Sequence, residues 1–209
     1  MKKTVTLIVA AVLSGHVLAQ SITLPTPQKT GGMPLMEALA KRSTSRAFAT
    51  NELSQQQISS LLWAAFGINR PDGKRTAPSA MNFQETDIYV LLQQGAYVYS
   101  AASNQLNLVV AEDIRALGGT QSFVKAAPVT LAFVADLAKC GGTNEGSRYT
   151  ANVDTGYISQ NVYLFCASEG LATGARGSVD RAALGQKLKL RPDQLIVLAQ
   201  SVGYPKATQ

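Results

Sequence analysis

Histidine and cysteine are scarce in this 209-residue sequence, which has one histidine and two cysteines. The single histidine, His16, lies in an N-terminal segment that we expect to be removed, so the mature protein would contain none. A mature chain without histidine has no Ser-His-Asp triad, no Cys-His pair, no histidine general base and no His-containing zinc or iron site. Any chemistry must therefore come from a cofactor, a carboxylate, a tyrosine or a lysine.

The sequence also lacks an apolar run long enough to anchor it in a membrane. Lys2 and Lys3 precede the apolar run 4–18, and Ala19 stands before a suitable cleavage point at Gln20. The run is shorter than the ~20 residues that a membrane-spanning helix needs. We therefore expect residues 1–19 to be a cleaved signal peptide, which places the protein in the periplasm or outside the cell with no membrane span.

Removal of 19 residues from 209 leaves 190, enough for one domain with a substantial core. The mature chain would carry 17 basic and 13 acidic residues, a net charge of +4. Because the basic residues are spread along the chain, they do not indicate a nucleic-acid surface. The prolines and glycines of residues 20–32 indicate an extended N-terminal arm, and residues 33–209 form the predicted domain.

The two cysteines, Cys140 and Cys166, leave two possibilities open. An oxidising compartment allows a disulfide between them. Free buried cysteines are also common, and Cys166 lies in an apolar segment next to Phe165.

Hydrophobic periodicity predicts alternating helices and strands. The clearest helix follows Ser54, which forms a capping box with Gln57, and ends at Gly67. The nearly continuous apolar run Pro128–Ala135 predicts an inner strand that is buried on both faces. The other predicted helices are 33–41, 111–117, 154–169 and a segment ending near Leu188, and the other strands are 88–92, 97–99, 106–110 and 195–202.

Three segments carry side chains suited to binding. Arg42–Arg46 combines two guanidinium groups with three hydroxyl groups, a set suited to a phosphate monoester, although a solvated basic helix end would look the same. Pro78–Gln84 offers the amides of Asn82 and Gln84 to a heterocycle, or is an ordinary turn. Gly170–Ser178 has glycines that allow close backbone approach to a flat ligand, but it follows a helix and lacks the sequence of a dinucleotide fingerprint or P-loop.

The order of these motifs resembles the FMN-dependent nitroreductase family over about residues 33–206. The matching motifs are Arg-Ser-x-Ser-Arg-x-Phe at 42–48, Leu-Leu-Trp-Ala-Ala-x-Gly at 61–67, Arg-Thr-x-Pro-Ser-Ala at 75–80, Gln-Asn at 160–161, Gly-Leu-x-Thr at 170–173 and Val-Gly-Tyr-Pro at 202–205. Within the family, the sequence is most similar to the branch that includes azoline-oxidising peptide dehydrogenases.

The resemblance implies an α+β fold with a mixed, mainly antiparallel sheet flanked by helices and FMN at a homodimer interface. It implies that the flavin phosphate is held by Arg42, Ser43, Thr44, Arg46 and Lys206. It implies that Pro78, Ser79, Ala80 and Asn82 meet the ring or ribityl chain from the other subunit. Gly177 and Ser178 would lie near the ring nitrogen that accepts hydride, where a backbone N–H stabilises developing charge.

The expected function is an FMN-dependent oxidoreductase that transfers two electrons through the flavin, with a small-molecule or peptide substrate. The resemblance assigns no catalytic side chain and no metal ligand, and hydride transfer to a flavin needs no side-chain base. The sequence identifies neither electron donor nor acceptor. The alternative is a protein of the same fold that binds flavin, or another partner, without turnover.

Overall fold

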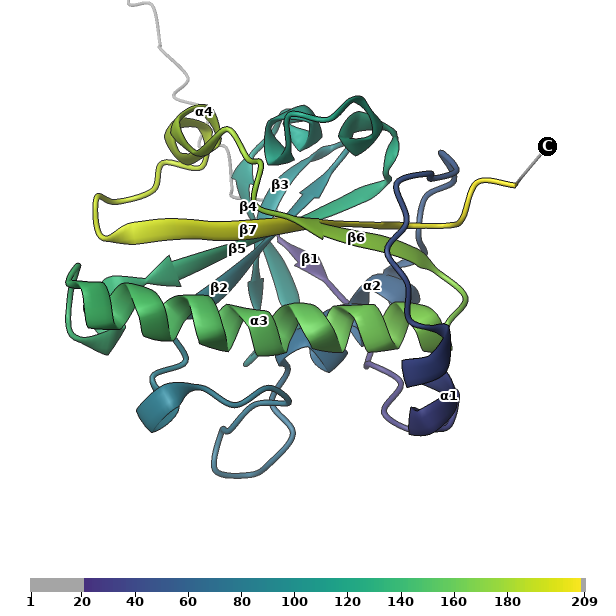
Figure 1. The fold of residues 1–209 in the computed structure, drawn as a ribbon, viewed down its shortest axis with the longest axis horizontal. Helices are drawn as coiled ribbons and strands as arrows, with labels where there is room; N and C mark the ends of the chain where they lie inside the picture. The colour runs from purple at the N-terminus through teal and green to yellow at the C-terminus, as the bar shows by residue number, and fades with distance from the viewer. Residues whose placement is uncertain (1–20, 208–209) are drawn as a thin grey trace, which may run out of the picture.

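The computed structural model describes residues 21–207, which form a seven-stranded sheet covered by helices on both faces (Figure 1). The strand order is β1-β4-β3-β2-β5-β7-β6, and each of the six pairings is antiparallel. The strands are β1 (Ile22–Thr23), β2 (Thr86–Leu92), β3 (Gly95–Ser100), β4 (Gln105–Val110), β5 (Val129–Asp136), β6 (Ala172–Arg176) and β7 (Gln194–Gly203). The predicted fold, a mainly antiparallel sheet flanked by helices, is confirmed. The proposed signal peptide, residues 1–19, lies outside the described residues.

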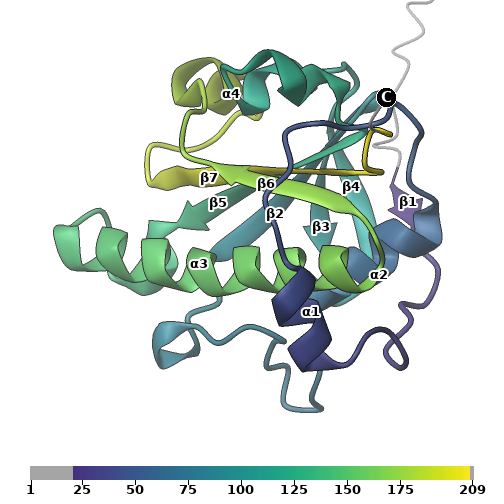
Figure 2. The same ribbon diagram turned by 45° about the vertical axis from the view of Figure 1, so that its right-hand side comes forward.

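Four α-helices surround this sheet: α1 (Leu35–Lys41), α2 (Gln55–Phe66), α3 (Glu145–Ser168) and α4 (Arg181–Lys187). The longest, α3, crosses one face of the sheet, with α1 and α2 beside it, and α4 lies on the opposite face (Figures 1 and 2). The predicted capping box is present at α2, because the Ser54 hydroxyl accepts from Gln57 N at 3.1 Å and the Gln57 side chain accepts from Ser54 N at 2.9 Å. No helix in this part of the chain is long and apolar enough to cross a membrane.

The core has two halves because alternate residues of the inner strands point to opposite faces. In β5, every residue is buried, as the apolar run predicted. Leu131 and Phe133 join the core beneath α2 and α3, whereas Ala132 and Val134 join the core beneath α4. The sheet therefore holds α3 and the loops at both ends of α3 in fixed positions.

Two of the predicted helices differ clearly from the structure, and one strand was not predicted. Helix α3 begins at Glu145 rather than near 154, because the Asn144 side chain caps it by accepting from Ser147 N at 2.9 Å, and its first turns are polar. The predicted helix 111–117 is a short 3-10 helix, Arg115–Gly118. The glycine-rich segment Gly170–Ser178, for which the sequence predicted no strand, contains β6, which pairs with β7 along its length.

Both cysteines are free and buried. The Cys140 sulfur lies 4.0 Å from the carbonyl oxygen of Ser147 at the start of α3, whereas Cys166 lies near the end of the same helix. A helix rises 1.5 Å per residue, so about 28 Å of helix separates Ser147 from Cys166. A disulfide, which needs Cα atoms within about 7 Å, cannot form between them.

Candidate functional site

The basic segment 42–46 lies beside β6, so the structure brings together two of the three segments singled out in the sequence. The Ser45 N–H donates to the Thr173 carbonyl oxygen at 2.8 Å. At Gly174 a Cβ atom would come within 2.7 Å of the Ser45 carbonyl oxygen, so only glycine allows this approach. The basic segment is thereby fixed against the strand that leads to Gly177 and Ser178.

Tyr163 of α3 joins the same two segments. Its hydroxyl lies 3.1 Å from the Thr44 hydroxyl and accepts from the Ala175 N–H at 2.9 Å. The Arg42 guanidinium lies over the Tyr163 ring, 5.3 Å from the ring centroid, a distance typical of a cation–π contact. Tyr163 thus orients the C-terminal end of α1.

The C-terminal tail brings a further cation to this region. Phe48 pairs with Pro205 in an antiparallel bridge, and Lys206 N donates to the Ala47 carbonyl oxygen at 3.4 Å. The Lys206 side chain is exposed. The backbone therefore places Lys206 next to the segment that carries Arg46, and the role of its side chain at a phosphate stays a prediction.

A cavity of about 230 Å³ opens between these elements. Its lining includes four predicted residues, Thr44, Arg46, Gly177 and Ser178. It also includes Ser45, Gly174, Ala175 and Arg176, which belong to the two predicted segments, and Gln121 and Phe123, which the sequence did not indicate. The cavity combines positive charge, hydroxyl groups and glycine backbone, the groups that a phosphorylated flat ligand requires.

Arg176 is the most unusual residue of this cavity. It is 9 % exposed, and burial lowers its pKa to about 10. Its Nε donates to the Gly118 carbonyl oxygen at 2.7 Å and its Nη1 donates to the Ser201 hydroxyl at 2.9 Å. Within residues 21–207, no salt bridge neutralises it, and its Nη2 and the Gln121 Oε1 are buried without hydrogen-bond partners. A buried cation without a counter-charge is costly and favours an anionic ligand nearby.

The third predicted group, Pro78, Ser79, Ala80 and Asn82, does not line this cavity within one chain. Ala80 N donates to Asp154 on α3 at 2.9 Å, whereas the basic segment contacts Tyr163 on the same helix. Asp154 and Tyr163 are separated by about 14 Å along the helix axis. The placement of this group against a second subunit's flavin stays a prediction.

Replacing Tyr163 with phenylalanine tests the link between the two segments. Loss of the hydroxyl leaves the half-buried Ala175 N–H without its acceptor and Thr44 without its partner, which we expect to cost about 1–3 kcal/mol in the free energy of unfolding. The measurement is denaturant unfolding. Tyr204→Phe is the matched control, because the Tyr204 hydroxyl makes one hydrogen bond, to Gln57 at 3.0 Å, away from the cavity. Equal losses in the two variants would contradict the linking role of Tyr163.

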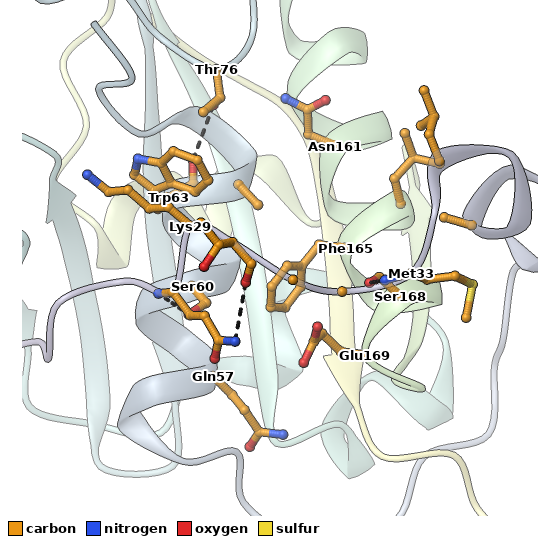
Figure 3. A pocket seen from close by; sticks show the side chains of 18 of the residues that line it. Lys29, Met33, Gln57, Ser60, Trp63, Thr76, Asn161, Phe165, Ser168 and Glu169 are labelled. Atoms are coloured by element: carbon orange, nitrogen blue, oxygen red, sulfur yellow. Dashed lines mark hydrogen bonds between the residues drawn. The ribbon is translucent and has the colours of Figure 1, made fainter. Parts of the chain in front are cut away.

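A larger cavity of about 470 Å³ lies between the N-terminal arm and helices α1, α2 and α3 (Figure 3). Hydrogen bonds hold the arm over it, from Gln28 N to the Ser60 hydroxyl at 3.0 Å and from Met33 N to the Ser168 hydroxyl at 2.8 Å. The Lys29 ammonium lies 5.5 Å from the centroid of the Trp63 ring. None of the residues predicted for the flavin lines this cavity, so it is separate from the candidate site.

Comparison with known proteins gives a consistent result. The model of the nitroreductase family matches residues 39–204. A nitroreductase candidate of Methanocaldococcus jannaschii is 27 % identical over 176 residues, which cover 78 % of this chain and 88 % of that protein. The crystal structure of a nitroreductase candidate from Ralstonia eutropha JMP134 is 38 % identical, with a TM-score of 0.85 and coverage of 90 % of both chains.

A second solved structure shares the fold alone. It is a candidate NAD(P)H:FMN oxidoreductase from Staphylococcus epidermidis, 15 % identical, with a TM-score of 0.64. The alignment covers 88 % of this chain and 95 % of that one.

Proposed function

This chain belongs to the nitroreductase family, and we propose that it is an FMN-dependent oxidoreductase whose flavin occupies the cavity beside β6. The observation that carries the proposal is the buried, unneutralised Arg176 next to a cavity that also contains Arg46, Thr44 and Ser178. This chemistry fits an anionic, flat cofactor. The name of the Staphylococcus epidermidis neighbour, which includes FMN, agrees with it.

The chain's own residues have distinct tasks in this proposal. Arg42, Ser43, Thr44, Arg46 and Lys206 bind the phosphate, with the arginines as bidentate donors. Gly177 and Ser178 face the ring. Arg176 adds a fixed positive charge that favours negative charge on a ligand in the cavity. When bound, FMN supplies the two-electron redox chemistry, and the protein supplies position and electrostatics.

A homodimer is the second part of the proposal, supported by exposed apolar side chains on α3 and in the loop before β2. Tyr149, Val153 and Tyr157 recur every fourth residue on α3, so they share one helix face, and Tyr149 is 71 % exposed. Met81, in the loop before β2, is 86 % exposed. Exposed apolar patches of this kind mark interaction surfaces. In the dimer, Pro78, Ser79, Ala80 and Asn82 of the partner subunit meet the flavin.

We also propose a cellular location and a substrate class for the enzyme. Export by residues 1–19 places the enzyme in the periplasm or outside the cell, where soluble NAD(P)H is scarce. A quinone, a small thiol or a protein partner would then be the electron donor, or a peptide would itself be oxidised. The motif resemblance favours an azoline-containing peptide as that substrate.

Anaerobic reduction of the purified protein separates an enzyme from a flavin-binding scaffold. We expect the reduced bound flavin to be reoxidised by a quinone or a nitroaromatic compound faster than free reduced FMN at the same concentration, as stopped-flow absorbance measures. A rate no faster than that of free FMN would support the non-catalytic alternative. Parallel mixing of the oxidised protein with an azoline peptide tests the peptide substrate.

A further inference from the structure

Two carboxyl groups are buried where the start of β2 meets α3, and the residues that follow them, Thr86 and Thr155, bring their hydroxyl oxygens within 3.3 Å of each other. Glu85 is fully buried and Asp154 of α3 is 4 % exposed. Neither carboxyl oxygen of Glu85 meets a hydrogen-bond donor among the described residues, and its carboxyl neighbour is Asp154. One proton held between the two groups would satisfy both, because a protonated carboxyl donates to an ionised one.

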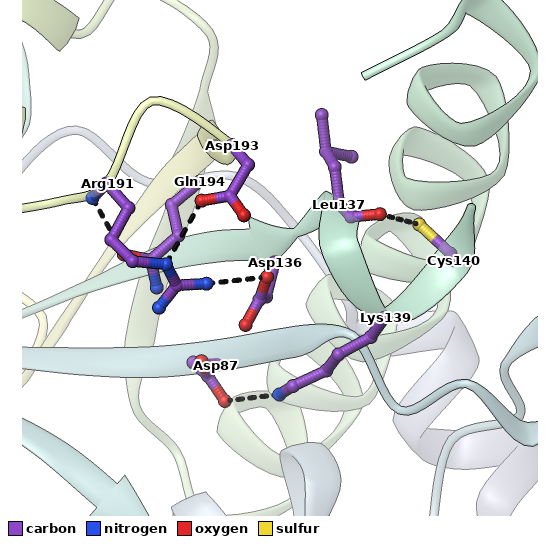
Figure 4. Close-up of polar contacts among 8 residues, drawn as sticks. All are labelled: Asp87, Asp136, Leu137, Lys139, Cys140, Arg191, Asp193 and Gln194. Atoms are coloured by element: carbon purple, nitrogen blue, oxygen red, sulfur yellow. Dashed lines mark hydrogen bonds and ion pairs between the residues drawn. The ribbon is translucent and has the colours of Figure 1, made fainter. Parts of the chain in front are cut away.

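The charged groups around this pair do not neutralise it. Lys139 pairs with Asp87 at 3.4 Å, and Asp136 pairs with Arg191 at 2.8 Å (Figure 4). The remaining neighbour is the Cys140 thiol, which is directed to the Leu137 carbonyl oxygen at 3.6 Å (Figure 4). Burial, followed by the charge of Asp154, raises the pKa of Glu85, while Lys139 opposes these effects.

Asp154 also holds the neighbouring turn. Its Oδ2 accepts from Ala80 N at 2.9 Å. Three residues of this turn have positive φ, Met81 at 49°, Asn82 at 57° and Gln84 at 48°. For residues other than glycine each such conformation costs about 1–3 kcal/mol and persists only where surrounding contacts impose it. Gln84 holds the end of the turn, since its N–H donates to the Ser79 hydroxyl at 3.0 Å and its Oε1 accepts from Arg75 Nε at 2.8 Å. Asp154 is the anchor that ties the start of the turn to α3.

We propose that Glu85 and Asp154 are positioning residues that share one proton and thereby fix the 79–84 turn in the shape that contacts the partner subunit's flavin. The contact between the turn and the flavin rests on the proposed function. The pairing of Glu85 with Asp154 does not depend on it. The proton stays on the Glu85 side, and the Asp154 carboxyl oxygen accepts from the Ala80 N–H. Ionisation of Glu85 sets two like charges together and loosens the turn.

The test uses Glu85→Gln, whose neutral amide donates to Asp154 at every pH. In isotope-labelled wild-type protein, we expect the Ala80 amide chemical shift to titrate as Glu85 loses its proton, and we expect this step to be absent in Glu85→Gln. Glu37→Gln, at an exposed glutamate on α1, is the matched control, and in this variant the Ala80 amide chemical shift should titrate as it does in wild type. An Ala80 amide that titrates equally in Glu85→Gln and wild type would overturn the proposal.

The pH dependence of unfolding provides a second readout. Because the pKa of Glu85 is raised in the folded state, its contribution is complete below the ordinary value of 4.5 and is lost as the pH rises through the folded pKa. Glu85→Gln should lack this decline, so its stability relative to wild type should increase with pH. If the free energies of unfolding of Glu85→Gln and wild type change with pH in parallel, the two carboxyl groups do not share a proton.

Flavin affinity then connects the pair to the site. Asp154→Ala removes the anchor of the turn, and we expect faster hydrogen exchange at the Ala80 amide together with an increase of about tenfold in the dissociation constant of FMN, the effect of losing roughly 1.4 kcal/mol. Unchanged exchange at Ala80 would overturn the anchoring role. If wild type itself takes up no FMN, the proposed function fails, and the Ala80 measurements still decide the role of the pair.

Discussion

Replacement of Arg42 and Arg46 together by alanine is expected to weaken FMN binding by at least about 100-fold while the fold and the dimer persist. Each guanidinium would make charge-assisted hydrogen bonds to the phosphate, worth about 1.5–3 kcal/mol. Two such losses amount to roughly 3–6 kcal/mol, and each 1.4 kcal/mol is a factor of ten in affinity. The backbone should hold, since Ser45 N and Lys206 N keep their bonds to Thr173 and Ala47.

Fluorescence titration with FMN measures this affinity, and size-exclusion chromatography with light scattering measures the oligomeric state. Lys41→Ala/Lys74→Ala is the matched control, because it removes two positive charges from exposed residues to which the proposal gives no contact with the phosphate. Full flavin occupancy in the arginine double variant would place the phosphate elsewhere. An equal loss in the lysine double variant would indicate a general charge effect.

Part of this site could be predicted from the sequence because its signals are local. The run 42–46 shows its cations and hydroxyl groups directly, and the capping box of Ser54 and Gln57 fixes the start of α2. Strand β5 is apolar throughout, so its inner position follows from composition. Such features can be predicted without knowing which distant segments of the chain contact them.

The features that were missed depend on contacts between distant segments. Nothing in the sequence shows that Gly174 permits the approach of Ser45 to β6, because the Ser45 carbonyl oxygen that a Cβ atom would meet comes from a distant segment. Arg176 lies in a segment that was singled out for its glycines, and the burial of its guanidinium group follows only from contacts with the distant residues Gly118 and Ser201. Glu85 and Asp154 are ordinary acidic residues in the sequence. Their contact arises only because α3 crosses the end of β2.

Replacement of Tyr157 by aspartate is expected to convert the dimer to monomers and to release the flavin with it. Tyr157 is 47 % exposed in the single chain, shares the apolar face of α3 with Tyr149 and Val153, and lies near the middle of the helix. At Gly156 a Cβ would meet no atom within 4 Å, so this part of the helix leaves room for a partner. An unpaired carboxylate buried in the interface would cost several kcal/mol. The flavin would then lose Pro78, Ser79, Ala80 and Asn82 of the partner subunit.

Analytical ultracentrifugation over a range of concentrations measures the dimer dissociation constant, which we expect to rise by more than about 100-fold. Asn107→Asp is the matched control, because it adds the same charge at an exposed position on β4. A dimeric, flavin-loaded Tyr157→Asp protein would show that α3 does not form the interface. The arginine double variant should lose flavin but remain dimeric, so the two variants separate cofactor binding from assembly.

The most direct test of the central claim is a calorimetric titration of the flavin-free mature protein with FMN. The proposed site beside β6 predicts saturable binding of one FMN per chain, weakened by added salt because the phosphate contacts are ionic. Riboflavin, which lacks the phosphate, should bind far more weakly. Absence of heat above dilution, or equal affinity for riboflavin and FMN, would contradict a phosphate-anchored flavin in this cavity.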